Sequence, residues 1–476
     1  MFKKRIFAAG LLIALLAGSM TGCFRKDEPQ QTGKLEPVRL VYYRMFDDED
    51  VIRPLIQQYQ STHSNVQITY RKFTNLEEYQ NLIVNELAEG EGPDIFSAPN
   101  YWILPNKKKL APAPVDFVSP QVFRDTFVNV AANDMIFSDP ADGVEKVYGI
   151  PMMVDTLALY YNKSAYEDKI PARGKPPVTW AELQEDVFLL TKKDQSFERF
   201  EQAGIAMGRS DNIARSTDIL FLLMIQHGID FYNDNMSKAE FSRQRTGTAT
   251  GVSVSPAAEA LGLYTGFALP ANKNYSWNQY ISDVNSSTKE LETFARGKVV
   301  MIFGYSYLYD QLAAQIKDLE GKGVKTISLN NVGIVPVPQV NDPATSTEKR
   351  DAYANYFVET VSRTSDHPQE AWDFLVFMSN KENLQYYNEK THRPTSRRDM
   401  IEDQMKDPIY GVFAEQIGYA ESMPIYDYAK YSEIFSKAVD SVLATVSVTD
   451  AVRIAEEEIN ALLPPEGMST PAAVIN

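Results

Sequence analysis

The chain has 476 residues, 44% hydrophobic and 23% charged, so it has material for more than one ordinary hydrophobic core. Its 24 Gly and 26 Pro residues follow no fixed period, and no low-complexity tract or internal repeat is visible, which excludes collagen, coiled-coil and largely disordered chains. The 63 acidic and 47 basic residues give a formal charge of -16, the wrong sign for binding phosphate backbones. We therefore expect two globular lobes and no nucleic-acid partner.

The N-terminal segment has the features of a secretory signal. Three basic residues precede an apolar run over residues 6–17, too short for a bilayer that needs about 20 apolar residues. The run ends in Met-Thr-Gly-Cys at residues 20–23, which resembles a bacterial lipobox, although Met20 differs from the usual Leu. In a lipobox the cysteine is lipidated and becomes the first residue of the mature protein.

Cys23 is the only cysteine, which excludes an intramolecular disulfide and a cysteine-based zinc site. We expect a signal peptide over residues 1–22, a lipid on Cys23 and a polar, flexible tether over residues 23–36. A free thiol beyond an ordinary cleavage site is the alternative. No later apolar run could span a membrane, so attachment would be by the lipid alone, with an acidic body outside the cytoplasmic membrane of the cell.

The first part of the folded chain alternates strands and helices, which predicts an α/β lobe with a largely parallel sheet. A capping box of Thr74 and Glu77 is expected to start the second helix, and Gly90 to end it. The acidic run over residues 47–50 could hold calcium, but it lacks the glycine and spacing of a known loop, so a helix start is the better interpretation. The expected elements are strands at 38–43, 66–70 and 93–96 and helices at 51–59 and 74–89.

A second lobe is expected to begin near residue 151, after a Gly/Pro-marked crossing. Thr179 and Glu182 repeat the capping-box pattern, and a polar loop is expected over residues 241–256. The remaining predicted elements are strands at 157–161, 299–303 and 357–361, a strand that runs out into a proline-marked connection over 332–338, helices at 180–187, 219–225 and 368–378, and a helical C-terminal part over 427–463.

Five segments in this order resemble a known family: residues 85–95 (NELAEGEGPDI), 148–163 (YGIP through TLALYYNK), 297–301 (GKVVM), 332–338 (VGIVPVP) and 368–375 (PQEAWDFL). The chain is similar over residues 38–463 to the extracellular solute-binding proteins of ATP-driven (ABC) importers, in the carbohydrate-binding family that includes maltose-binding protein. The resemblance implies a two-lobed α/β periplasmic-binding-protein fold (type II), with ligand held in a cleft between lobes that close by hinge bending. By this analogy lobe 1 holds residues 37–150 and 336–388, and lobe 2 holds 151–335 and 389–476.

A sugar site needs aromatic planes for stacking and planar polar side chains for hydrogen bonds, and this chain has 26 Tyr, 24 Phe and 4 Trp. Strand ends should carry such residues into the cleft. Asp155 matches a position that commonly contacts ligand in the family, and Tyr305 and Tyr307 follow a strand where the family often has a stacking aromatic. The complete set of candidate ligand-binding residues is Tyr43, Arg44, Asn100, Tyr101, Trp102, Asp155, Tyr305, Tyr307, Arg393, Tyr426 and Tyr431. Each could instead pack in the core, as is expected of Tyr160 and Tyr161.

Catalysis finds little support in the sequence. The four histidines are scattered, and no HExxH pair, G-x-S-x-G elbow or phosphate loop occurs. We expect a monomeric receptor without cofactor or metal that binds a carbohydrate and delivers it to an ABC transporter permease. Three alternatives stay open: a non-sugar ligand such as a peptide, a polyamine or a phosphorylated polyol, a secreted hydrolase, and a lipoprotein for adhesion or sensing. An anionic ligand would suit Arg44, Arg209 and Arg393.

Overall fold

The computed structural model describes residues 36–139, 142–194, 199–246, 253–282 and 288–465. The expected signal peptide, Cys23 and, apart from Glu36, the expected tether lie outside the described residues. From Val38 onward the chain forms one compact unit. In the described part, no helix has both the length and the apolar character needed to cross a membrane.

The first sheet has the strand order β14-β3-β1-β2. Strand β1 pairs in parallel with β2 and β3, and β14 pairs antiparallel with β3, so the predicted parallel order is confirmed for the first three strands. All five residues of β3 are buried, as a central strand requires. The strands are β1 (Val38–Met45), β2 (Val66–Phe73), β3 (Ile95–Pro99) and β14 (Phe357–Val361).

The second sheet has the order β12-β6-β11-β8-β7 and mixes parallel and antiparallel pairs. Strand β11 runs parallel to β8 and antiparallel to β6. Tyr160 and Tyr161 of β6 are buried in the core, as predicted. The strands are β6 (Ala158–Asn162), β7 (Lys192–Lys193), β8 (Phe200–Ile205), β11 (Val299–Gly304) and β12 (Val332–Val335).

Three further pairs of short strands complete the described strands: β4 (Ile136–Ser138) with β5 (Glu145–Val147), β9 (Arg245–Thr246) with β10 (Ser253–Val254), and β13 (Ala352–Tyr353) with β15 (Ala420–Glu421). The segment over residues 241–256 is therefore not only a loop, because β9 and β10 pair antiparallel within it.

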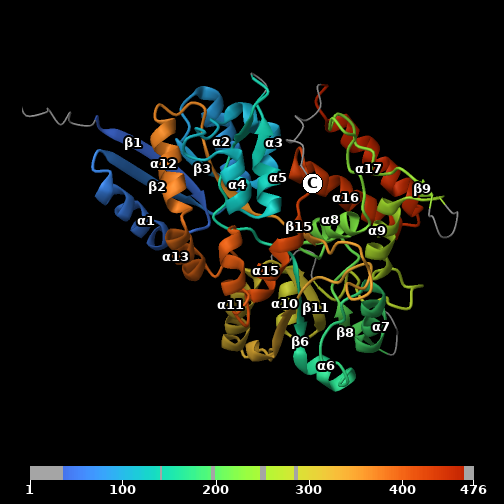
Figure 1. The fold of residues 1–476 in the computed structure, drawn as a ribbon. Coiled ribbons are helices and arrows are strands. Elements are labelled where there is room, and N and C mark those ends of the chain that lie inside the picture. The colour runs from blue at the N-terminus through green and yellow to red at the C-terminus, as the bar shows by residue number, and fades with distance from the viewer. Residues whose placement is uncertain (1–35, 140–141, 195–198, 247–252, 283–287, 466–476) are drawn as a thin grey trace, which may run out of the picture. The chain divides into compact units, whose positions relative to one another are not determined.

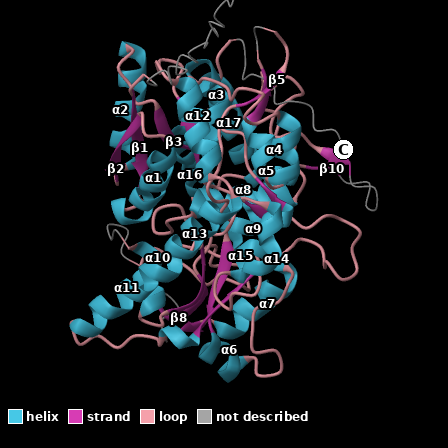
Figure 2. Cartoon of the chain, turned by 60° about the vertical axis from the view of Figure 1, so that its left-hand side comes forward, coloured by secondary structure: helices cyan, strands magenta, loops and turns pink. Residues whose placement is uncertain are grey.

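Helices lie around both sheets (Figures 1 and 2). They are α1 (Glu49–Thr62), α2 (Leu76–Glu89), α3 (Asn100–Asn106), α4 (Pro120–Thr126), α5 (Asn129–Met135), α6 (Lys163–Lys169), α7 (Trp180–Leu190), α8 (Ser216–Gln226), α9 (Pro256–Gly266), α10 (Lys289–Ala295), α11 (Leu308–Gly321), α12 (Pro368–Met378), α13 (Lys381–Thr391), α14 (Ile401–Gln404), α15 (Gly411–Gln416), α16 (Tyr428–Leu443) and α17 (Val448–Leu462). The buried side chains of both sheets belong to one hydrophobic cluster.

The helix ends test the predicted caps. Helix α7 begins as predicted, because the Thr179 hydroxyl accepts a hydrogen bond from the backbone N–H of Glu182. The cap predicted for α2 is wrong: Asn75, not Thr74, accepts from the backbone N–H groups of the first turn. Gly90 ends α2 in the left-handed conformation, with φ of 79°, where a side chain would be strained.

Candidate ligand-binding site

The turn that follows strand β11 places two tyrosines side by side. Gly304 ends the strand against Leu308, whose side chain leaves no room for a Cβ atom at the glycine. Tyr305 and Tyr307 then stack, with ring centroids 5.8 Å apart and planes inclined by 23°. Tyr305 is 2% exposed and Tyr307 is half-buried, so only the second ring is open to a ligand.

Asp155 holds this turn in place. Its carboxylate accepts hydrogen bonds from the backbone N–H of Ser306 at 3.1 Å and from the Ser306 hydroxyl at 2.7 Å. Its own neighbour Thr156 donates a backbone N–H at 3.0 Å. Burial raises the pKa of Asp155, while the positive charge of Arg393 opposes the rise. Asp155 thus positions the tyrosine turn, and its described contacts are within the protein.

The N-terminus of helix α8 adds an arginine and an aspartate to the tyrosine turn. Asp218 is fully buried and accepts hydrogen bonds from the hydroxyls of Tyr305 at 3.0 Å and Tyr428 at 2.6 Å. Burial raises the pKa of Asp218, and Arg215, 4.0 Å away, lowers it. The Arg215 guanidinium also lies over the rings of Tyr305 and Tyr307 and donates to the Tyr307 hydroxyl.

Helix α3 approaches the same cluster through Tyr101. Its ring stacks on Tyr428, the first residue of α16, with centroids 5.2 Å apart and planes inclined by 20°. Both rings are half-buried. Because Tyr101 follows β3 of the first sheet and Tyr305 follows β11 of the second, the cluster joins strand ends of the two sheets.

Arg393, which lies just after α13, also contacts the Tyr307 ring. Its guanidinium carbon is 5.2 Å from the Tyr307 ring centroid, and its Nη1 atom is buried without a hydrogen-bond partner among the described residues. An unpartnered buried donor is costly, so this nitrogen is suited to an acceptor supplied by a ligand. We call Tyr101, Arg215, Asp218, Tyr305, Tyr307, Arg393 and Tyr428 the tyrosine–arginine cluster.

Two cavities border this cluster. One, of about 420 Å³, is lined by Arg215, Tyr305 and Tyr307 together with residues of α10 and α11. The other, of about 440 Å³, is lined by Arg393 with residues of α13, α14 and Tyr410. Each lies within the size range of small-molecule sites. Aromatic faces, hydroxyls and guanidinium groups at such cavities can stack on an apolar ring face and hydrogen-bond to a polar rim.

A model of the bacterial extracellular solute-binding proteins matches residues 54–410, three quarters of the chain. The chain belongs to this family. Family membership places the solute-binding protein outside the cytoplasm, and the members of the family are binding proteins. The solute-binding protein is also 21% identical over 379 residues to a protein of Brucella abortus (strain 2308) described as a binding protein, covering 78% of this chain and 79% of that one.

Solved structures share the mixed α/β fold of two-lobed solute-binding proteins. The sugar-binding protein MalE of Xanthomonas citri aligns with a TM-score of 0.68 at 16% identity, covering 89% of this chain and 97% of that one. The cyclic α-maltosyl-1,6-maltose binding protein of Arthrobacter globiformis aligns with a TM-score of 0.67 at 18% identity, covering 89% and 98%. A solute-binding protein of an ABC transporter from Thermotoga lettingae, bound with α-D-tagatose, aligns with a TM-score of 0.62 at 19% identity, covering 89% and 99%.

The structure brings five of the predicted residues together: Tyr101, Tyr305, Tyr307 and Arg393 in the cluster, with Asp155 behind it. Other predicted residues pack elsewhere. Asn100 is buried, donates to Asp134 at 2.9 Å and accepts from the backbone N–H of Tyr356. Trp102 packs edge-on against Phe96, and Tyr43 packs against Phe73 and Arg71. Tyr431 is fully buried against Phe231 and exchanges a hydrogen bond with Tyr232, whereas Tyr426 is 39% exposed.

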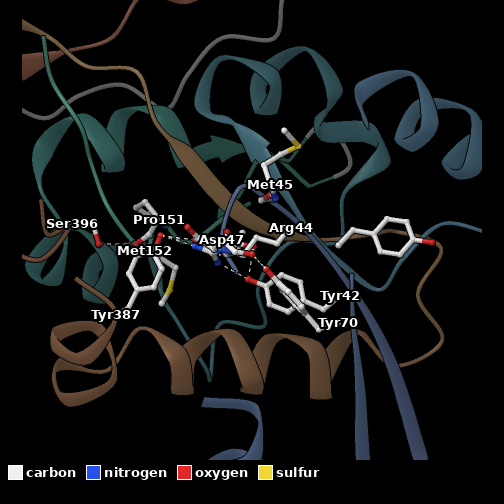
Figure 3. A network of polar contacts seen from close by, with 12 residues as sticks. Tyr42, Arg44, Met45, Asp47, Tyr70, Pro151, Met152, Tyr387 and Ser396 are labelled. Atoms are coloured by element: carbon white, nitrogen blue, oxygen red, sulfur yellow. Dashed lines mark hydrogen bonds and ion pairs between the residues drawn. The ribbon is translucent and has the colours of Figure 1, made fainter. Parts of the chain in front are cut away.

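Arg44 lies in a different buried network (Figure 3). Its guanidinium pairs with Glu359 at 2.8 Å and with Asp47 at 2.8 Å, and donates to the hydroxyls of Tyr42 at 2.6 Å and Tyr387 at 2.9 Å. Arg44 is 3% exposed. All three nitrogen atoms of the Arg44 guanidinium have partners within the protein. Its contact with a ligand stays a prediction, and these surroundings do not favour it.

This second network, which we call the Arg44 network, is linked to the segment at Pro151 and Met152. The Asn388 amide, next to Tyr387, donates to the backbone carbonyl of Met152 at 3.2 Å. The Ser396 hydroxyl donates to the carbonyl of Pro151 at 2.6 Å (Figure 3). The network therefore connects β1, α13 and the segment at Pro151 and Met152.

Sequence reasoning missed Arg215 and Asp218. The run over residues 219–225 reads as an apolar core helix, and nine residues of α8, Asp218 among them, are indeed buried. The available signal is a carboxylate at the start of an otherwise apolar helix, three residues after an arginine, since a buried Asp must have partners. Tyr428 offered no signal beyond its place in a tyrosine-rich segment before the last helices.

Proposed function

We propose that the protein is a receptor that captures a sugar or oligosaccharide outside the cell and hands it to the membrane permease of an ABC importer. The observation that carries the proposal is the tyrosine–arginine cluster, which offers stacking faces and hydrogen-bonding groups from the strand ends of two sheets. The fold neighbours named above as sugar-binding proteins support the ligand class. No bond is made or broken in this function.

Binding is proposed to close two lobes around the ligand. Lobe 1 would comprise residues 37–150 and 336–388, and lobe 2 residues 151–335 and 389–476, with Tyr101 on the first and Tyr307 on the second. A ligand shifts the balance of open and closed forms only by its differential affinity for them, so contacts with both lobes are required. A dissociation constant near a micromolar, about -8 kcal/mol, would suit capture followed by release.

The receptor is proposed to be a monomer held at the membrane by a lipid on Cys23, with residues 24–36 as the tether. Replacing Cys23 by Ala tests the anchor, because the variant should move from the membrane fraction to the soluble fraction. A Cys23→Ala variant that stays with the membrane would contradict lipid attachment at this residue.

Thermal unfolding of a chain starting at Phe24, scanned against ligands, tests the ligand class. A ligand at 100 times its dissociation constant should raise the free energy of unfolding by about 2.7 kcal/mol, which gives a visible shift of the melting temperature. The panel contains mono- and oligosaccharides, with peptides, polyamines and a phosphorylated polyol as controls. Stabilisation by a group of saccharides supports a sugar receptor, and stabilisation only by a non-sugar overturns the ligand class. An oligosaccharide that is cut during incubation would indicate a hydrolase.

A further inference from the structure

Arg393 combines a positive charge with an unmet hydrogen-bonding capacity. Its Nη1 atom is buried and has no partner, and Arg393 forms no ion pair with the described residues. Other arginines near the strand ends differ. The Arg44 guanidinium is taken up by Glu359 and Asp47, and that of Arg209 by both oxygens of Asp211. Of these three arginines, Arg393 is the one left to meet an acceptor from outside the chain.

The carboxylates around Arg393 already have partners. The positive charge of Arg393 acts on the buried carboxylate of Asp155, whose oxygens accept hydrogen bonds from Ser306 and Thr156. In the cavity that Arg393 lines, Asp403 pairs with Lys406 at 2.7 Å, and the Asp407 side chain accepts two backbone N–H groups. Glu389, in the same cavity, accepts from Gln385 at 2.8 Å.

A second guanidinium group strengthens the positive character of this place. Arg215 lies 5.5 Å and Arg393 5.2 Å from the centroid of the same Tyr307 ring. The acidic partner of Arg215 is Asp218, 4.0 Å away, whose two oxygens accept from Tyr428 and Tyr305. An anionic group beside the Tyr307 ring would therefore be attracted by two guanidinium groups, Arg215 lining one of the two cavities and Arg393 the other, while the nearby carboxylates accept hydrogen bonds within the protein.

We propose that the ligand is an acidic saccharide, in which a uronic-acid carboxylate accepts the hydrogen bond of the buried Arg393 nitrogen beside the Tyr307 ring. Guanidinium and carboxylate match in geometry and charge, whereas a neutral hydroxyl would meet the donor without forming an ion pair. Arg215, whose guanidinium also contacts the Tyr307 ring, adds electrostatic attraction for the carboxylate. The inference rests on the proposed sugar-receptor function and narrows its substrate class.

Calorimetric titration of the full-length protein tests the inference. The probes are galacturonate and glucuronate with their di- and trisaccharides, the corresponding galactose and glucose saccharides, and acetate as a carboxylate without a sugar. The uronates should bind at least about tenfold more tightly than their neutral counterparts, as expected for a charge-assisted hydrogen bond. Their affinity should fall as NaCl is raised, and acetate should bind too weakly to detect.

Arg393→Gln should weaken uronate binding by about tenfold or more, weaken the binding of neutral saccharides less than that, and flatten the salt dependence. Arg453→Gln on the exposed face of α17 is the matched control and should change neither. Melting curves without ligand show whether each variant is folded. Arg393→Lys keeps the positive charge and should retain part of the preference for uronates. If a neutral saccharide bound as tightly as its uronate, or if Arg393→Gln weakened the binding of both equally, the acidic nature of the ligand would be overturned. The proposed sugar-receptor function would still stand. Binding of peptides or polyamines with no saccharide bound would overturn the sugar receptor itself.

Discussion

Two buried clusters of the same residue types differ in one respect. In the Arg44 network, arginine, carboxylates and tyrosines satisfy one another, and Arg44 and Glu359 are 3% and 1% exposed. In the tyrosine–arginine cluster, Asp155 and Asp218 are satisfied, but Arg393 keeps an unpartnered nitrogen and Tyr101 and Tyr307 are only half-buried. Closure of the first cluster on itself indicates a structural role. Unfinished hydrogen bonding in the second, at the border of two cavities, indicates a ligand.

The largest effect is expected from Arg44→Met. Removing one partner leaves Glu359 buried without its cation, which typically costs about 3–5 kcal/mol of the free energy of unfolding. Denaturant titration measures the loss, and ligand affinity should not change. Arg53→Met removes an ion pair that is more than half exposed on α1, and should cost at most about 0.5 kcal/mol. Equal losses in the two variants would contradict a structural role for the Arg44 network.

The pH dependence of stability should reveal the titration of Asp351, a carboxylate that is less buried than Asp218 and Glu359. Burial and the nearby Glu421 raise the pKa of Asp351 to about 6, against the lowering effect of Lys349. The folded state therefore holds this proton more tightly than the unfolded state, so the contribution of Asp351 is complete below about pH 4 and is lost as the pH rises through 6. Stability should fall by about 2 kcal/mol over this range.

Asp351→Asn removes this titration and is followed by urea unfolding between pH 4 and 7. Any decline that remains belongs to groups such as Asp218 and Glu359, whose pKa values are also raised by burial. In the Arg44→Met protein that remaining decline should be steeper, because Arg44 lowers the pKa of Glu359. A variant with the pH profile of the parent protein would exclude Asp351 as the titrating group.

Tyr428→Phe is expected to have a smaller effect. The ring and its stacking on Tyr101 remain, but buried Asp218 loses a hydrogen bond of 2.6 Å, which should cost about 1–3 kcal/mol of stability. Tyr280→Phe, at a site where the side chain is 70% exposed, should stay within about 0.5 kcal/mol of the parent. No loss in Tyr428→Phe would mean that the remaining partners of Asp218, Tyr305 and Asn355, satisfy its carboxylate.

Sequence patterns predicted the elements well where local chemistry decides them. The Thr179 cap and the Gly90 stop follow from short-range hydrogen bonding and backbone conformation. Thr74 and Asn75 can both cap a helix, and the spacing of Thr74 and Glu77 pointed to the wrong one of the two. Strand ends also predicted that Tyr101 and Tyr305 face a common cleft, and the structure links the two residues through Tyr428 and Asp218.

Sequence patterns could not predict which charged residues pair within the protein and which stay available to a ligand. Arg44 follows a predicted strand and Arg393 lies just past a predicted lobe boundary, and their difference depends on Glu359 and Asp155, which are distant in sequence. Arg215 and Asp218 belong to a helix whose sequence is typical of the core, and only their contacts with Tyr305, Tyr307 and Tyr428 give them a place in the site. Long-range pairing of charges decides function here, and periodicity carries no information about it.

The smallest predicted effect, that of Tyr101→Ala, tests which strand end of the first sheet contacts the ligand. Tyr101→Ala removes a half-buried ring that stacks on Tyr428, so ligand affinity should fall about tenfold and stability by about 1 kcal/mol. Tyr43→Ala is the matched control, since Tyr43 also ends a strand of the first sheet but packs against Phe73 instead. Titration of both variants with the saccharide found in the melting screen measures the difference. If Tyr43→Ala weakened binding and Tyr101→Ala did not, the ligand would lie at the end of β1, beside the Arg44 network, and the roles of the two buried clusters would be reversed.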